Sequence, residues 1–428
     1  MHQIPSSDEI VAGGMNAEGT DAVLQPNAFV ITPFTINVPQ SALDDLTRRL
    51  EMTRWPTRET VSDWSQGVPL ARVRALVDYW RTTDDWRRCK AMLDAFGPYR
   101  TEIEGLGIHC LHVRSRHPHA LPLVLSHGWP GSVLEFAKGI GPLTDPTGHG
   151  GNAEDAFHVV IPSLPGFGFS DQPTGTGWNV ERTASAWAAL MRRLGSTHDA
   201  AQGGDWGAGI TTHMAQLEPE GLVGIHLNWP LVMPAHIPTA ALSADEQAAV
   251  AGVNTFLGEG AGDFRAQATR PQTIGYSLAD SPVGQLAWIY DQFHDWTDSD
   301  GDPEKVLTKD EILDDVMLYG WPDAAAASAR FYWENRDVTM NMGPVEKIPV
   351  ACSIFPHEIY RAPRRWAEQT YKQLIYWHEL DRGDHLAALE QPEIFVHELR
   401  AAFHKPLFRE HLASPLRGKS HAASSGRH

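Results

Sequence analysis

The sequence predicts an α/β protein: a mostly parallel sheet with helices on both faces, an inserted helical lid and a helical N-terminal domain. Short apolar runs of strand length alternate with helical stretches between residues 99 and 230. The strand pattern then stops over residues 231–345, which are helical in pattern and rich in aromatic side chains. Two more apolar runs follow within residues 346–412. A helical block between two halves of a parallel sheet is typical of a lid over an active site.

Length, composition and charge narrow the class of protein. The chain has 428 residues, more than one compact core usually holds, so a large domain with an appendage or insertion is expected. Hydrophobic residues make up 42% and charged residues 21%, as in soluble globular proteins, and no apolar run approaches the ~20 residues of a membrane span. The net charge of −18 argues against a nucleic-acid partner, which needs concentrated positive charge.

The cysteines and histidines do not follow a metal-binding pattern. Three widely spaced cysteines suggest neither a disulfide framework nor a metal site, and we expect them to be small buried hydrophobes. The 21 histidines are scattered, with no His-Glu-x-x-His spacing. We therefore expect no metal and no cofactor. The first residues lack the basic start and apolar run of a secretion signal, so a cytoplasmic location is expected.

The N-terminal part is expected to be helical and without strands over residues 30–98. Leucines at three- and four-residue spacing follow Ser41, a candidate N-cap, and a second helical stretch begins near residue 69. Residues 1–29 and 413–428 are polar and rich in small side chains, and we expect both ends to be disordered.

The predicted sheet begins with a hairpin. "YRTEIEGLGIHCLHVRS" alternates around a Gly-Leu-Gly turn. The later strands are the apolar parts of "PLVLSHG", "FHVVIPS", "AAQGG", "LVGIHLNW", "IPVACSIFP" and "QLIYWHELDRGDH". Functional groups of open parallel sheets lie beyond the carboxyl ends of the strands, so the residues that follow these runs are the candidates for a site.

Asp205 follows one of these strands in "GGDWG". The surrounding glycines permit the tight strand-to-helix turn of a nucleophile elbow, which exposes a reactive side chain on strained backbone. Taken alone, the motif is also explained by an aspartate that caps an ordinary helix.

The segment "HGWPGS" follows an earlier strand and begins with His127 and Gly128. Such a loop can turn backbone N–H groups toward the nucleophile. The donors of an oxyanion site would then be the N–H groups of Trp129 and of Trp206, the residue after Asp205. A plain Gly-Pro turn is the simpler explanation of this motif on its own.

The base and its acid are expected after the last two strands. His385 lies just beyond the last strand, where the histidine of a nucleophile, acid, histidine series belongs. Glu358 follows the penultimate strand and could accept the second imidazole N–H; His357, Asp381 and Asp384 are its neighbouring competitors. Four such segments in order predict an α/β-hydrolase fold with an aspartate nucleophile.

A carboxylate suits attack on a saturated carbon, because it is already ionised at neutral pH. The resulting ester would be hydrolysed by water that His385 activates with Glu358 behind it. Epoxides and alkyl halides are substrates of this kind. An epoxide oxygen needs an acidic O–H, for which Tyr332 in "RFYWEN" is the candidate, whereas a halide needs N–H donors such as the indole of Trp206. A half-buried packing role would also explain Tyr332.

These motifs together resemble the microsomal-type epoxide hydrolases, which include juvenile-hormone hydrolases and bacterial relatives. The resemblance rests on "INVPQSALDDLTRRLEMTRWP", "HGWPGS", "PSLPGFGFS", "QGGDWG", "DSPVGQLAW", "RFYWEN", "FPHE" and "ALEQPE" and spans about residues 33 to 407. It implies that Asp205 is the nucleophile, His385 the base, Glu358 the acid of the charge relay and Tyr332 one of two tyrosines that bind and protonate the epoxide oxygen. We expect no counterpart of the membrane anchor of the mammalian members.

The chain departs from the family at the other tyrosine. Counting back from Gln267 in "DFRAQATRP" places Asp263 at its position, and the neighbouring Phe264 has no proton to donate. Tyr276 and Tyr290 would need a different lid geometry to replace it. The base motif is "GDHL", in which Asp384 is expected to be a surface residue, the alternative being that it perturbs the pKa of its neighbour.

The first hypothesis is therefore hydrolysis of an epoxide to a vicinal diol, with the epoxide and water as small-molecule partners. A specialised biosynthetic role fits the missing tyrosine. Haloalkane dehalogenation and epoxide-opening cyclisation on the same scaffold are the alternatives, and a non-catalytic binding protein is a third. The sequence is compatible with a homodimer but does not decide the oligomeric state, the substrate or the stereochemistry.

Overall fold

The computed structural model describes residues 30–237, 242–404 and 408, and within them one nine-stranded sheet has the order β1-β2-β3-β5-β4-β6-β7-β8-β9. The strands from β5 to β9 in this order pair in parallel, and the three at the other edge pair antiparallel. Their bounds are β1 (Ile31–Pro33), β2 (Pro98–Ile103), β3 (Leu106–Val113), β4 (Leu121–Ser126), β5 (Phe157–Pro162), β6 (Asp199–Gly203), β7 (Leu222–Leu227), β8 (Val350–Ile354) and β9 (Leu374–Glu379).

The central strands β6, β7 and β8 are buried along their whole length. Strands covered on both faces read as continuous apolar or small-residue runs, which is why the sequence shows these strands clearly. Two packed helix pairs cover the sheet: α5 (Val180–Arg193) with α6 (Trp206–Leu217), and α4 (Ala137–Thr144) with α15 (Pro392–Phe403). The short helices α13 (Arg364–Thr370) and α14 (Ala387–Glu390) complete the second half of this domain. The sheet is thus mostly parallel and covered by helices, as predicted.

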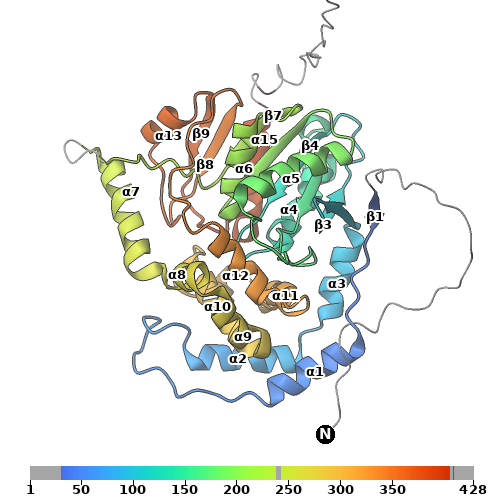
Figure 1. Ribbon diagram of the computed structural model, residues 1–428, viewed down its shortest axis with the longest axis vertical. Helices are drawn as coiled ribbons and strands as arrows, with labels where there is room; N and C mark the ends of the chain where they lie inside the picture. The colour runs from blue at the N-terminus through green and yellow to red at the C-terminus, as the bar shows by residue number, and fades with distance from the viewer. Residues whose placement is uncertain (1–29, 238–241, 405–407, 409–428) are drawn as a thin grey trace, which may run out of the picture.

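The predicted lid is a group of helices between the sheet and the N-terminal helices (Figure 1). Among the described residues, strand pairing stops after β7 and resumes at β8, apart from isolated bridges of Val232 with Asn341 and of Val345 with Tyr371. The lid helices are α7 (Ala244–Thr255), a π-helical turn (Phe256–Gly260), α8 (Gly262–Thr269), α9 (Pro271–Asp280), α10 (Pro282–Asp295), α11 (Lys309–Gly320) and α12 (Ala325–Glu334).

The N-terminal helices α1 (Gln40–Glu51) and α2 (Leu70–Thr82) lie on the far side of the lid from the sheet, and α3 (Trp86–Ala95) runs beside the lid back toward the sheet, where β2 begins (Figure 1). Helices α1 and α2 contact α10, and α2 also contacts α11. The N-cap of α1 is Pro39 and not Ser41, which lies in the first turn. Helix α2 ends at Thr82, and α3 begins four residues later.

The prediction that this part has no strand is wrong, because β1 pairs antiparallel with β2 at the edge of the sheet. Its three residues are exposed or half-buried, so they lack the alternation that would have revealed a strand. The hairpin of β2 and β3 turns at Glu104 and Gly105, which both have positive φ, one residue earlier than the predicted Gly-Leu-Gly turn. A two-residue turn with positive φ at both central residues has a backbone twist that matches the twist of the two strands it joins.

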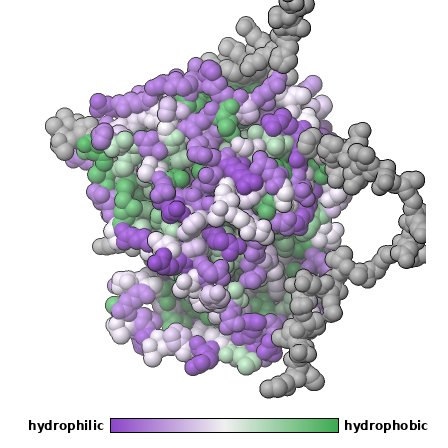
Figure 2. Space-filling view, in the orientation of Figure 1, coloured by the Kyte–Doolittle hydropathy of each residue, from purple (hydrophilic) through white to green (hydrophobic). Residues whose placement is uncertain are grey.

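Polar and charged side chains cover most of the face seen in Figure 2, with smaller apolar areas between them. None of the described helices combines the length and apolarity that crossing a bilayer requires. The three cysteines are buried and unpaired, in agreement with the expectation that they pack as small hydrophobes. The two ends predicted to be disordered lie outside the described residues.

Candidate active site

Asp205 stands on a strained turn between β6 and α6. Its backbone has φ 50° and ψ −131°, a conformation that residues other than glycine rarely adopt. Close packing of the turn requires the glycines around it: a Cβ on Gly207 would lie 1.9 Å from the carbonyl oxygen of Ser126 at the end of β4. The turn therefore has the geometry of a nucleophile elbow, with the carboxylate at the carboxyl end of the sheet.

The carboxylate of Asp205 is held from two sides. The backbone N–H of Trp129 donates to Oδ1 at 2.9 Å, and Nε2 of His385 lies 3.1 Å from Oδ2. Gly128 makes this approach feasible, since a Cβ there would lie 1.9 Å from Oδ1. The other predicted donor, the N–H of Trp206, belongs to the first residue of α6, where helix N–H groups have no intrahelical partner.

His385 forms the next link. Its Nδ1 lies 2.6 Å from Oε1 of Glu358, and both side chains are almost completely buried. Burial alone would lower the pKa of His385, but the charge of Glu358 and the hydrogen bond and charge of Asp205 outweigh it and hold the pKa well above its usual value. Of the competing acids and bases, His357 is exposed and pairs with Asp298 instead.

Asp384 is buried, with 5% of its surface exposed, so the prediction of a surface residue is wrong. Its Oδ1 accepts the N–H of His385 at 2.8 Å, and its own N–H donates to Glu390 at 2.7 Å. Burial raises the pKa of Asp384 to about 8. Charged residues are mostly exposed in proteins, and nothing in "GDHL" revealed that α14 folds back over this loop. Asp384 therefore organises the backbone of the loop that carries the base.

His127 is a structural member of the site. It is buried, its Nδ1 lies 2.8 Å from the carbonyl oxygen of Gly128, and its Nε2 accepts the N–H of Leu164 at 3.2 Å. Burial lowers its pKa to about 4, so the ring is neutral at pH 7. His127 thus fixes the loop that presents the N–H of Trp129, by joining it to the loop after β5.

A cavity of about 340 Å³ lies between Asp205 and the lid. Its polar side chains include Asp205, Asp263 and Tyr332. The walls are otherwise mostly apolar and are formed by Val180, Trp229, Leu231, Met233, Val253, Phe256, Leu257, Phe264, Trp296, Val338, Met340 and Ile359, among others. The nucleophile therefore faces a pocket that suits an apolar molecule with one polar centre.

Tyr332 lies inside this cavity, on α12, with only 3% of its surface exposed. Its ring meets those of Trp206 and Trp129 edge to face, with centroids 4.9 Å and 5.8 Å away. Burial raises the pKa of Tyr332 well above its usual value, and the charges of Asp205 and Asp263 act in the same direction. The hydroxyl is thus protonated at neutral pH and available as a donor.

The two tyrosines considered as replacements do not line the cavity. Tyr276 is 71% exposed on α9. Tyr290 is buried on α10, and its hydroxyl donates to Glu304 at 3.3 Å. Of the three candidate tyrosines, only Tyr332 reaches the site.

The aromatic side chains around His385 were not predicted from the sequence. The rings of Trp296 and Trp229 pack on His385, with centroids 5.0 Å and 5.1 Å away. Nor was a role predicted for Asp263, which lines the cavity from α8. The signal for Trp296 was the aromatic run that follows "DSPVGQLAW". For Asp263, the only signal was its place in the pattern that normally holds a tyrosine.

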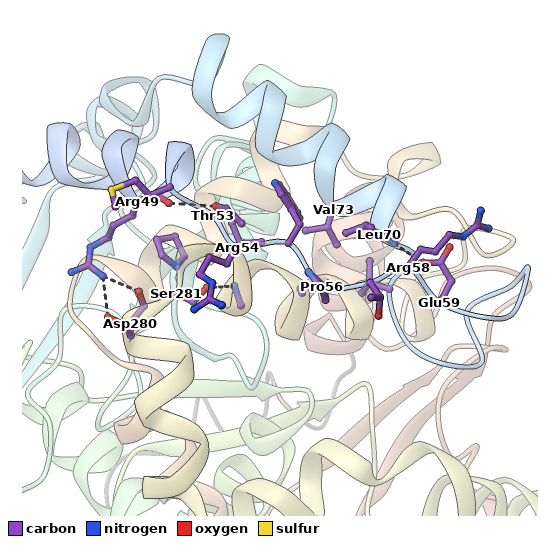
Figure 3. A pocket seen from close by; sticks show the side chains of 18 of the residues that line it. Arg49, Thr53, Arg54, Pro56, Arg58, Glu59, Leu70, Val73, Asp280 and Ser281 are labelled. Carbon is purple, nitrogen blue, oxygen red and sulfur yellow. Dashed lines mark hydrogen bonds and ion pairs between the residues drawn. The ribbon is translucent and has the colours of Figure 1, made fainter.

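A larger hollow of about 1000 Å³ lies between the N-terminal segment and the lid (Figure 3). Its charged groups already have partners or face solvent: Arg49 donates to the carbonyl oxygen of Asp280 at 2.8 Å and to its carboxylate at 3.4 Å. None of the residues of the catalytic constellation lines it. We assign the smaller cavity as the candidate active site, because the buried titratable groups with shifted pKa values lie there.

Comparison with known proteins gives consistent matches along most of the chain. Residues 31–136 match the family described as epoxide hydrolase N terminus, and residues 122–395 match the alpha/beta hydrolase fold. A protein of Stigmatella aurantiaca named "Putative epoxide hydrolase" is 63% identical over 87% of this chain and 84% of its own length. Epoxide hydrolase 1 of Sus scrofa is 35% identical over 86% of this chain and 88% of its own length.

Two solved structures of epoxide hydrolases also resemble this chain. The juvenile hormone epoxide hydrolase of the silkworm Bombyx mori superposes with a TM-score of 0.82 at 29% identity, covering 90% of this chain and 96% of that one. The epoxide hydrolase of Aspergillus niger gives a TM-score of 0.77 at 29% identity, covering 89% and 96%.

Proposed function

The chain belongs to the epoxide hydrolase family, and we propose that the cavity above Asp205 is the place where it opens an epoxide to a vicinal diol. The observation that carries the assignment is the hydrogen-bonded series from Asp205 through His385 to Glu358, with links of 3.1 Å and 2.6 Å. This series begins at a strained elbow and faces an apolar pocket. In this proposal Asp205 is the nucleophile, His385 the base, Glu358 its acid partner and Tyr332 a proton donor.

The first step forms an ester. A carboxylate oxygen of Asp205 attacks an epoxide carbon, the ring C–O bond breaks, and its electron pair goes to the ring oxygen. Tyr332 lies on the lid side of the cavity, where its hydroxyl can donate to that oxygen. The apolar walls exclude water from the reacting carbon and favour an apolar epoxide.

The second step hydrolyses the ester. Ester formation removes the charge of Asp205, one of the two carboxylates that keep the pKa of His385 high. His385 can then release its proton to solvent and, as a neutral imidazole, take one from water, while Glu358 stabilises the imidazolium that forms. The hydroxide adds to the ester carbonyl, and the oxyanion faces the N–H groups of Trp129 and Trp206. Collapse releases the diol, which takes the proton from His385.

The matches to epoxide hydrolases disfavour the dehalogenase, the cyclase and the non-catalytic binding protein. The reaction needs only the epoxide and water. The cytoplasmic location and the homodimer stay predictions, which cell fractionation and light scattering of the purified protein would test.

Replacing the base separates the two steps. His385→Gln is expected to form the ester and to hydrolyse it at least about 100-fold more slowly, because the water loses its general base. After incubation with styrene oxide, intact-protein mass spectrometry should show one adduct, located on the peptide of Asp205. The double variant with Asp205→Ala is the control and should show none. Unimpaired steady-state hydrolysis by His385→Gln would refute the assigned role.

A further inference from the structure

Asp263 is a buried carboxyl group without a side-chain partner. It lies in the first turn of α8, and only 6% of its surface is exposed. No other side chain donates a hydrogen bond to Oδ1 or Oδ2, and only the nearby backbone N–H groups of Phe264 and of Asp263 itself act to lower its pKa. Leaving such a group unpaired in the interior costs free energy, so most buried polar groups are hydrogen-bonded. Asp263 lines the cavity of Asp205, and its two oxygens lie just behind the surface that water can reach, so a small shift of the side chain would bring them to a molecule in that cavity.

The charged neighbours of Asp263 favour its neutral form. Burial raises its pKa to about 7, and the negative charges of Asp205 and of Asp291 on α10 act in the same direction. From α12, the group that faces it is the hydroxyl of Tyr332, whose pKa the charge of Asp263 raises in turn. The cation on the cavity wall, Arg336, is exposed and lies over the ring of Trp333 instead. A large share of Asp263 therefore carries a proton at neutral pH.

We propose that Asp263 is the second acid of this site: its protonated carboxyl group binds the epoxide oxygen together with Tyr332 and gives up its proton as the ring opens. The proposal rests on the function proposed above. Asp205 forms the new C–O bond, the ring C–O bond breaks, and the ring oxygen takes the proton of Asp263. A carboxylate is left on Asp263 as the charge of Asp205 disappears, so the net charge of the cavity is unchanged.

This exchange of charge supports the reaction. While Asp205 is ionised, it keeps the proton on Asp263; once Asp205 becomes an ester, that effect ends, and Asp263 becomes a stronger acid as the alkoxide forms. Hydrolysis later returns Asp205 as a carboxylic acid. Its proton passes to solvent, and Asp263 takes one up before the next cycle.

The acid at this position also fixes the pH dependence of ring opening. A tyrosine would stay protonated to about pH 10. A carboxylic acid that titrates near pH 7 makes the rate of ester formation fall about tenfold for each further pH unit. In a plot of this rate against pH, the fall above pH 7 is a descending limb. If Asp263 had only a structural role, the plot would not show this limb.

The test is stopped-flow mixing of the enzyme with excess styrene oxide between pH 5.5 and 9, followed by the fluorescence of the tryptophans around Asp205. Wild type should give a burst whose rate falls above pH 7. Asp263→Asn should slow the burst roughly 10- to 100-fold and remove the limb near pH 7, because an amide cannot transfer the proton. Asp263→Tyr should restore much of the rate and move the limb above pH 9. The matched control is Asp84→Asn, a carboxyl group whose pKa burial also raises to about 7 but which lies outside the cavity, and it should leave the burst unchanged.

An Asp263→Asn burst with the wild-type rate and the wild-type limb would overturn the proposal. So would a slow Asp263→Asn variant with a lowered melting temperature whose rate Asp263→Tyr does not restore, since the role would then be structural. Failure of the proposed function gives a different result, because wild type itself would then form no adduct on Asp205.

Discussion

Asp205, His385 and Asp263 form a set of groups whose protonation depends on the charge of the nucleophile. The charge of Asp205 raises the pKa of both of the others. Alkylation of Asp205 therefore has two effects at once: it favours the neutral imidazole of His385, the form that can take a proton from water in the second step, and it makes Asp263 a stronger acid for the first. Each effect appears only when the ester forms, which is when the reaction requires it.

Removing the hydroxyl of Tyr332 is expected to slow ester formation. Tyr332→Phe should lower the burst rate with styrene oxide roughly 10- to 100-fold, because the ring oxygen loses one of its donors, while ester hydrolysis changes much less. Tyr290→Phe is the matched control: that hydroxyl contacts Glu304 outside the cavity, and ester formation should not change. An unaffected Tyr332→Phe burst would place the proton donor elsewhere.

The elbow depends on how closely α6 approaches β4. At Gly207 a Cβ would collide with the backbone of Ser126, so the helix could not keep its position. The same helix carries the N–H of Trp206, and its first residue follows the nucleophile directly. The placement of the carboxylate and of the oxyanion donors is thus a property of this one helix-to-strand contact.

Gly207→Ala is expected to destabilise the fold by about 1–3 kcal/mol and to abolish most activity, because overpacking forces the backbone apart. Gly139→Ala on α4 is the matched control. There the new Cβ would meet Val396 at an ordinary 3.5 Å, and a helical glycine-to-alanine change should stabilise by about 0.5–1 kcal/mol. Urea unfolding and initial rates measure both. A Gly207→Ala variant as stable and active as wild type would contradict this account of the elbow.

The mostly parallel sheet and the residues at its strand ends could be predicted from the sequence, because buried parallel strands are continuous apolar runs and functional groups follow them. Asp205, His385 and Glu358 were predicted because each follows a strand, and the structure adds the hydrogen bonds that join them. Burial of charged groups could not be predicted in this way. Whether Asp384 or Asp263 is buried depends on how α14 and α8 pack against distant segments, and no local pattern encodes that.

The lid forms the roof of the cavity, and the N-terminal helices support the lid. Arg72 pairs with Asp302 at 3.0 Å, and Arg88 pairs with Asp314 at 2.8 Å. These contacts join α2 and α3 to the lid and thereby support α10 to α12, which include the helix of Tyr332. The N-terminal part thus acts on the site through the lid, without lining the cavity.

The stability of the folded chain should fall between pH 6 and pH 8. Burial raises to about 7 or 8 the pKa of six carboxyl groups: Asp84, Glu135, Asp263, Asp315, Asp384 and Glu390. They are neutral in the fold and charged in the unfolded chain, so unfolding releases protons and rising pH favours it. The raised pKa of His385 acts in the same direction, since its stabilising proton is lost as pH rises.

Each such group contributes about 1.4 kcal/mol per pH unit until it ionises in the fold. Thermal unfolding followed by circular dichroism should therefore give a lower Tm at pH 8 than at pH 6. Asp263→Asn should reduce this difference, since it removes one of the groups. A Tm that rises between pH 6 and pH 8 would contradict the burial of these carboxyl groups in their neutral form.

A single labelling experiment shows whether Asp205 forms a covalent ester. The enzyme, in excess over styrene oxide, is allowed a single turnover in heavy-oxygen water, and its peptides and the diol are analysed by mass spectrometry. We predict one heavy oxygen in the carboxyl group of Asp205 and an unlabelled diol, because water attacks the ester carbonyl. Label in the diol and none in Asp205 would show that water attacks the epoxide itself and would contradict the account.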